Sequence, residues 1–224
     1  MSALNWRAIE SAHLVRAPFD HMAIAQALEP DAIAAITADF PAIRDSGSFA
    51  LADAPPGPAV RELIAELESP RFRRQMARIF GIDLEGRPAV VTLRGQCASR
   101  DGRVHIDSKS KLISLLLYLN EGWADPDGQL RLLDGPEDLE APAVEIPATI
   151  GSLVAFQRSD HSWHGHTSFA GQRRVVQLNY LRSERDSLVG NLRRRLSALT
   201  KRRGDRPSTI TASTSARRCC SNRS

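Results

Sequence analysis

The order of apolar and polar positions divides the chain into a helical first part and a second part made of short strands. Residues 29–40 place apolar side chains at helical spacing, and Pro41 follows as a stop. Two further helices are predicted over 59–68 and 71–80, and Gly81 ends the second as a C-terminal cap. The remaining predictions for this part are a strand between 14 and 24 and a loop over 44–57.

After Gly86 the pattern changes to short apolar runs separated by Gly, Pro, Asp and Asn. These runs predict five strands, at 89–93, 112–119, 129–133, 152–156 and 175–181. Closely spaced short strands of this kind are typical of a small antiparallel sandwich or jelly roll. We therefore predict a mainly β (α+β) fold, with helices first and then an all-β core.

Charge separates the end of the chain from the rest. From Arg182 onward there are twelve Arg and Lys and three Asp and Glu, a net charge of +9, which leaves −5 for residues 1–181. After Gly190 the sequence starts as a basic helix and then becomes rich in Ser, Thr and Arg, which predicts disorder beyond about Arg203. We divide the chain into a helical support over 1–84, a β core over 85–183, and a basic helix with a disordered tail over 184–224.

Composition argues against several classes of protein. A chain of 224 residues with 42% apolar and 25% charged residues is ordinary for a soluble globular protein. The longest apolar run, 112–119, is far too short to span a membrane. The first twenty residues show no signal-peptide core, so a cytoplasmic protein is expected. Three cysteines, Cys97, Cys219 and Cys220, fit neither a disulfide framework nor a zinc motif.

Four of the six histidines lie in two short windows of the β region. The first window contains His105-x-Asp107, and residues i and i+2 of a strand point to the same face. The second window offers His161, His164 and His166. Two ligands from one strand and a third from a distant strand would make a 2-His-1-carboxylate triad, which leaves coordination positions open for oxygen chemistry on ferrous iron.

Two nearby features suit a dicarboxylate. Arg173 and Arg174 follow His164 by nine and ten residues, and a guanidinium can grip a carboxylate through two parallel hydrogen bonds. Tyr118 is a phenol on an otherwise apolar strand, where a buried hydroxyl needs a polar partner. A dicarboxylate co-substrate would satisfy both groups.

A resemblance to the 2-oxoglutarate/Fe(II)-dependent oxygenase superfamily, in its prolyl 4-hydroxylase-like branch, rests on two runs: HIDSKSKLISLLLYLNEGWADPDGQLRLL and PATIGSLVAFQRSDHSWHGHTSFAGQRRVVQLNYL. The family order is H-x-D, a Y-L-N strand, a G-x-L-R-L strand, a proline before G-x-L-V-x-F, S-x-H, a basic residue about ten positions later, and a strand ending in an aromatic. All are present in this order within 85–183. One departure is Asp127-Gly128, where the family often has two glycines.

The resemblance implies a double-stranded β-helix, the cupin-like jelly roll, with Fe(II) on His105, Asp107 and His164. His164 is chosen because it occupies the S-x-H position. His166 is the second choice for this ligand and His161 the third.

The resemblance also implies that Arg174 and Tyr118 hold the far carboxylate of 2-oxoglutarate. Arg174 is preferred because Tyr180 follows it by six residues, as the family's aromatic does. Strand alternation would then aim Arg174 and Tyr180 inward and Arg173 outward. Arg173 is the alternative.

The implied activity is hydroxylation of an unactivated C–H bond with release of succinate and CO₂, and ascorbate would help to keep the iron reduced. The substrate is open between a prolyl residue of a protein and a small molecule, because substrate contacts lie on variable loops. Arg94 and Gln96, just before the H-x-D, are candidates to face it.

Two other classes are considered. A cupin-like metal-binding protein without oxygenase activity would leave the basic residue and Tyr118 without a role. A nucleic-acid or membrane-surface binder would act through the basic tail, but the tail lacks the interleaved aromatics that nucleic-acid binding favours.

Overall fold

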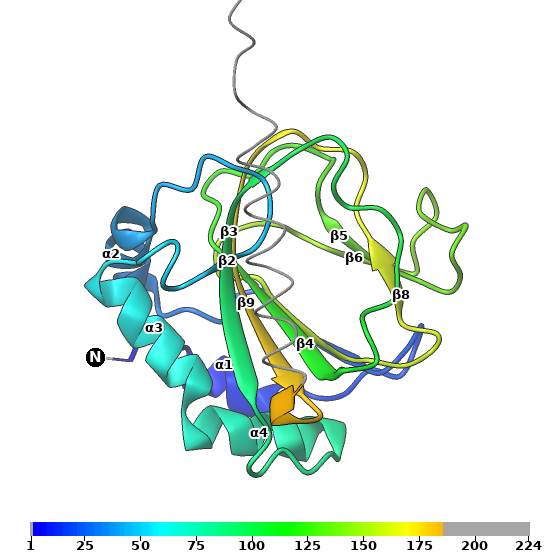
Figure 1. Ribbon diagram of the computed structural model, residues 1–224, viewed down its shortest axis with the longest axis horizontal. Coiled ribbons are helices and arrows are strands. Elements are labelled where there is room, and N and C mark those ends of the chain that lie inside the picture. The colour runs from blue at the N-terminus through cyan, green and yellow to red at the C-terminus, as the bar shows by residue number, and fades with distance from the viewer. Residues whose placement is uncertain (1, 186–224) are drawn as a thin grey trace, which may run out of the picture.

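The computed structural model describes residues 2–185 as a layer of helices and two antiparallel sheets (Figure 1). The helices are α1 (Trp6–Ser11), α2 (Pro30–Asp39), α3 (Pro58–Glu68) and α4 (Pro70–Phe80). The strands are β1 (His21–Ile24), β2 (Phe49–Ala50), β3 (Ala89–Cys97), β4 (Lys111–Tyr118), β5 (Leu130–Leu133), β6 (Val144–Ile146), β7 (Leu153–Gln157), β8 (Trp163–Gly165) and β9 (Gly171–Leu181). None of the helices in this described range combines the length and apolar character that a bilayer crossing requires.

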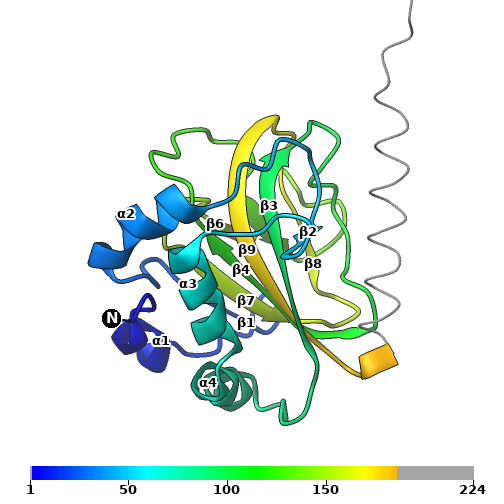
Figure 2. The ribbon, with the colours of Figure 1, turned by 60° about the vertical axis from the view of Figure 1, so that its left-hand side comes forward.

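The larger sheet has the strand order β1-β7-β4-β9-β3-β2, and the smaller has the order β6-β5-β8. The helices cover the face of the larger sheet that points away from the smaller one (Figures 1 and 2). The prediction of a mainly β fold with helices at its start is therefore confirmed.

The three predicted helices are present within one residue of their expected bounds. Pro58 and Pro70 stand at the first turns of α3 and α4, where the missing N–H costs nothing. The Ser69 hydroxyl accepts the backbone N–H of Phe72 at 3.2 Å and so caps α4. Gly81 ends α4 in the left-handed conformation, with φ 65°, as its position predicted.

Strand β4 explains why the 112–119 run is apolar almost throughout. Leu115 and Leu117 pack toward the helices, whereas Leu116 and Tyr118 lie in the cluster between the two sheets. Side chains of a strand point alternately to its two faces, so a strand in the middle layer must be apolar on both. Ser114 interrupts the run and is fully buried.

The first part of the chain also contributes strands to the larger sheet. β1 pairs with β7 at one edge, within the predicted 14–24 strand, and β2 pairs with β3 at the other, inside the predicted 44–57 loop. One apolar core joins α1–α4 to the larger sheet. The division at 84/85 stays a prediction, and the basic helix and tail predicted over 184–224 lie, apart from two residues, outside the described range.

Asn120, which follows β4, ties three segments together. Its side-chain N–H groups donate to the carbonyls of Ala148 at 2.7 Å and Arg174 at 3.3 Å, and its oxygen accepts the Arg174 N–H at 2.6 Å. Because this side chain is buried, Asn120→Ala leaves backbone groups without partners and should lower the free energy of unfolding by about 2–3 kcal/mol. Urea denaturation checks this against the exposed neighbour Glu121→Ala, and equal stabilities of the two variants would contradict it.

Candidate metal centre

A short backbone pairing brings His105 and His164 together. The two residues form an isolated antiparallel bridge, with N–H to carbonyl distances of 3.0 and 3.1 Å. Residues directly opposite in such a bridge place their side chains on the same side, and the two imidazole centroids lie 4.4 Å apart. The expected regular strand through His105 and Asp107 is absent, since only His105 pairs and Asp107 lies in the loop before β4.

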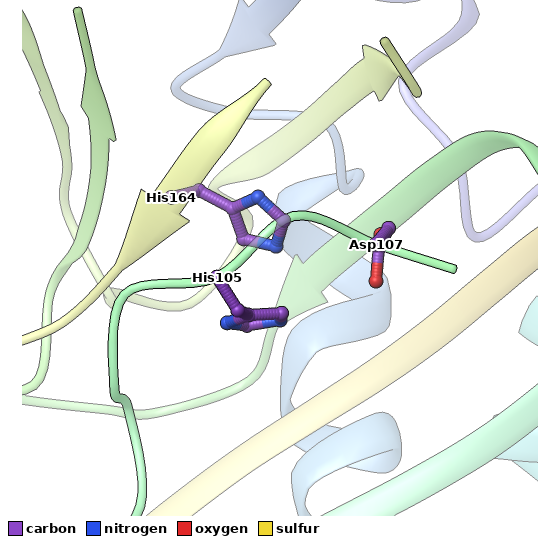
Figure 3. A group of neighbouring side chains, drawn as sticks. All are labelled: His105, Asp107 and His164. Carbon is purple, nitrogen blue, oxygen red and sulfur yellow. The ribbon is translucent and has the colours of Figure 1, made fainter. Parts of the chain in front are cut away.

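Asp107 is held from β4 rather than by strand alternation. Its Oδ1 accepts a hydrogen bond from Lys111 Nζ at 2.7 Å, and its Oδ2 accepts the Ser114 hydroxyl. One ligand atom from each of His105, Asp107 and His164 lies within 4.8 Å of the others (Figure 3). The structure thus brings together the three residues that the sequence selected.

The tautomers of both histidines suit metal binding. Nδ1 of His105 lies 2.8 Å from the carbonyl oxygen of Arg103, and Nδ1 of His164 lies 2.9 Å from that of Ser162. A carbonyl oxygen can only accept, so each neutral ring carries its proton on Nδ1 and keeps the lone pair of Nε2 free. This is the usual support of a metal-bound histidine.

The protonation states agree. Burial lowers the pKa of His164 to about 4, so its ring is neutral near pH 7. Burial raises the pKa of Asp107, but the charge of Lys111 and the hydrogen bonds from Lys111 and Ser114 outweigh it, and the pKa lies below its ordinary value. Two imidazoles and one carboxylate fit a divalent iron ion and leave coordination positions for other ligands.

The two alternative histidines do not join this group. His166 donates from Nδ1 to the carbonyl of Thr167 at 2.8 Å, and its Nε2 lies 3.7 Å from the Cys97 sulfur. Its ring lies against Gly102, where a Cβ would come within 2.2 Å of it and where φ is +83°. His166 therefore supports the loop that leads to His105, and His161 is exposed.

The structure reverses the predicted orientation of the arginine pair. Arg173 is buried, its Nη2 donates to the Tyr118 hydroxyl at 3.0 Å, and its Nε donates to the Gly128 carbonyl at 2.8 Å. Arg174, the expected inward residue, instead lies on the helix side, 5.6 Å above the Phe40 ring.

The side chains of β9 alternate between the two faces of the sheet as predicted, but each lies on the face opposite to the one expected. Val176, Leu178 and Tyr180 pack in the core below the helices, whereas Val175 packs between the sheets. Tyr180 was expected to point inward together with Arg174, but Arg73 of α4 stacks over its ring on the helix side. Because β9 is apolar on both faces, the sequence pattern alone could not fix the phase.

Tyr118 remains a neutral phenol at this position. Burial raises its pKa above the ordinary value, although the charges of Arg173 and Arg94 oppose the shift. The hydroxyl therefore accepts from Arg173 and keeps its own proton to donate. A guanidinium and a phenol arranged in this way can hold one carboxylate.

Sequence reasoning missed three supporting residues. Lys111 and Ser114 hold the Asp107 carboxylate, and the serine inside the apolar 112–119 run was a visible signal. Gly128 orients Arg173 through its carbonyl, and its φ of +76° with Phe169 packed against it requires glycine. This glycine belongs to the Asp-Gly pair noted as a departure from the family.

Comparison with known proteins identifies the family. Residues 96–182 match a family model described as the 2OG-Fe(II) oxygenase superfamily. These residues belong to that superfamily. This match confirms the resemblance seen in the sequence and indicates a 2-oxoglutarate-dependent dioxygenase.

Solved structures share the fold of this chain. It is similar to a Pseudomonas putida prolyl-4-hydroxylase, with a TM-score of 0.53 and 18% identity over 79% of this chain and 98% of that chain. A 2OG-Fe(II) oxygenase-family oxidoreductase from Burkholderia pseudomallei is also similar, with a TM-score of 0.48 and 16% identity over 73% and 84% of the two chains. At 18% identity the likeness to the first shows a shared fold alone. No curated protein matches the chain.

The protein should lose stability in mild acid because His166 is buried. Burial lowers the pKa of His166 from 6.5 to about 4, and the charge of Arg173 acts in the same direction. Between these values the unfolded chain binds more protons than the folded chain, so the free energy of unfolding falls as the pH falls. His166 alone should account for a loss of about 2 kcal/mol between pH 7 and pH 5.

Urea denaturation of the metal-free wild-type protein and of His166→Asn at these two pH values measures this contribution. Only the change with pH is compared, since the substitution also removes packing around Gly102. An equal change with pH in both proteins would contradict the neutral, buried state of His166.

Proposed function

We propose that this protein is an Fe(II)- and 2-oxoglutarate-dependent hydroxylase. His105, Asp107 and His164 would hold the iron, and Arg173 with Tyr118 would bind the distal carboxylate of 2-oxoglutarate. The observation that carries the proposal is that the residues holding both groups lie on one face of the same strand. Ser114, which holds Asp107, and Tyr118, which contacts Arg173, lie on the same face of β4.

The spacing on this face supports the proposal. Ser114 and Tyr118 are four residues apart, which is about 13 Å along a strand. That span suits a five-carbon dicarboxylate together with the side chains that hold its two ends. Leu116 and Val175, both buried between the sheets, supply an apolar wall between the metal group and Arg173.

We also propose that the two sheets are the halves of a double-stranded β-helix. The supporting observation is how the chain crosses between them. After β4 it enters the smaller sheet for β5 and β6, returns for β7, enters it again for β8 and returns for β9. The His105 bridge extends the smaller sheet beyond β8, where a jelly roll needs one more strand.

Bound ferrous iron would supply the activation of dioxygen that couples oxidation of 2-oxoglutarate to succinate and CO₂ with hydroxylation of a C–H bond. The chain's own residues would hold the metal ligands in place and orient the co-substrate. The Nδ1 hydrogen bonds fix both imidazoles, Lys111 and Ser114 fix the carboxylate, and the Arg173–Tyr118 pair sets the direction of the co-substrate. The substrate is a prolyl residue of a protein or a small molecule, and ascorbate would keep the iron reduced.

The alternative of a cupin-like metal-binding protein without oxygenase activity fits less well. It gives no role to Arg173, a buried guanidinium whose hydrogen bonds go to a phenol and one carbonyl. A buried charge of this kind is costly unless a counter-charge binds there.

The metal ligands are tested by substitution. His164→Ala should abolish tight Fe(II) binding, because it removes a buried ligand atom from the group. His166→Asn should retain it, because His166 contacts Cys97 and Thr167 instead. Anaerobic Fe(II) titration followed by calorimetry distinguishes the two, and loss of binding only in the His166 variant would contradict the assignment.

The co-substrate is tested by anaerobic titration of the Fe(II)-loaded protein with 2-oxoglutarate, which should produce a weak visible charge-transfer band. Arg173→Met should raise the apparent Kd about 10–100-fold, since it removes hydrogen bonds from a charged group to the carboxylate. Arg174→Met is the matched control and should leave the Kd unchanged, because Arg174 lies on the helix side. A fully iron-loaded protein that gives no band would overturn the proposed function.

A further inference from the structure

A second arginine lies on the same face as the Arg173–Tyr118 pair. Arg94 of β3 is directly opposite Val175 of β9, and Val175 is directly opposite Tyr118 of β4. Directly paired residues of antiparallel strands share a face, and Val175 packs between the sheets. Arg94 and Tyr118 therefore flank Val175 on the face that looks toward the smaller sheet.

The guanidinium of Arg94 lacks a direct partner. Across the described range it forms neither a hydrogen bond nor an ion pair, and the side chain is half-buried. The nearby Asp101 carboxylate accepts the backbone N–H of Ala98 at 2.9 Å. Burial lowers the pKa of Arg94 and so does the charge of Arg173, while Cys97, Asp101 and Tyr118 oppose the shift.

Two partly desolvated cations side by side are unfavourable in the absence of an anion. Arg173 uses Nε and one Nη2 hydrogen on Gly128 and Tyr118 and retains other N–H groups, and Arg94 retains all of its own. The pair thus offers more N–H donors, and one more positive charge, than the single guanidinium and phenol described above.

We propose that Arg94 is a second binding residue for the distal carboxylate of 2-oxoglutarate, so that two guanidiniums and one phenol hold this group. The inference rests on the proposed function and extends it to the selection of the co-substrate. A 2-oxo acid without a distal carboxylate leaves both cations uncompensated and is disfavoured.

The position of Arg94 favours the co-substrate over the substrate as the source of the anion. Arg94 is level with Val175 and Tyr118 across the sheet. Ser114, which holds Asp107 in the metal group, lies four residues away from Tyr118 along β4. Arg94 therefore lies at the end of the site away from the iron, whereas a carbon to be hydroxylated must approach the iron itself.

The test compares wild type, Arg94→Met and Arg100→Met, all Fe(II)-loaded and free of oxygen. Arg100 is the matched control, an exposed arginine in the loop after β3. Calorimetric titrations use 2-oxoglutarate and oxalate, which chelates the metal but lacks a distal carboxylate. Arg94→Met should weaken 2-oxoglutarate binding about 10–100-fold and leave oxalate binding unchanged, and Arg100→Met should change neither.

Thermal denaturation of the metal-free, ligand-free proteins supplies a readout that is independent of the metal. Arg94→Met should have a Tm equal to or above that of wild type, since it removes an uncompensated charge. A 2-oxoglutarate Kd within twofold of wild type overturns the inference, and so does an equal loss of oxalate binding. Failure of wild type itself to bind 2-oxoglutarate overturns the proposed function. That outcome differs from binding of 2-oxoglutarate that is the same in wild type and Arg94→Met.

Discussion

The pair of backbone hydrogen bonds between His105 and His164 is the constraint on which the site depends. These residues are far apart in the chain, and each belongs to a segment with little regular structure of its own. Their pairing sets the two imidazoles beside each other, with their ring planes tilted by 56°, and the carbonyls of Arg103 and Ser162 fix the tautomers. The loop before His105 can approach β8 because Gly165 and Gly102 leave room for backbone, where a Cβ on Gly165 would lie 2.7 Å from the Gly102 oxygen.

The face of the larger sheet that looks toward the smaller one carries polar groups at both ends of its strands. At one end, Ser114 and its hydrogen-bond partner Asn179 form a buried polar patch beside Asp107. At the other end are Tyr118 and Arg173, with apolar side chains between. Backbone hydrogen bonds run across all of these strands, so the two ends are held at a fixed separation.

Much of this arrangement could be predicted from the sequence, and the failures have physical causes. The three predicted helices stop within two residues of a proline or a glycine, and the long apolar runs are strands. Both signals are local, so they can be read from the sequence. The histidines and the aspartate proposed as metal ligands were recognisable because their order in the chain is specific. Strands β6 and β8, with three residues each, are too short to show alternation. Arg173 was assigned to the wrong face because β9 is apolar on both sides, so that only tertiary packing selects its phase.

The edge position of β1 has a consequence beyond the site. β7 is buried on both faces, and its outer backbone hydrogen bonds are made with β1, which comes from the first 24 residues. A chain that lost this segment would present an apolar strand with open N–H and C=O groups along one side of the sheet. Such an edge is a template for pairing with another copy. The beginning of the chain therefore protects the molecule from self-association as well as completing its sheet.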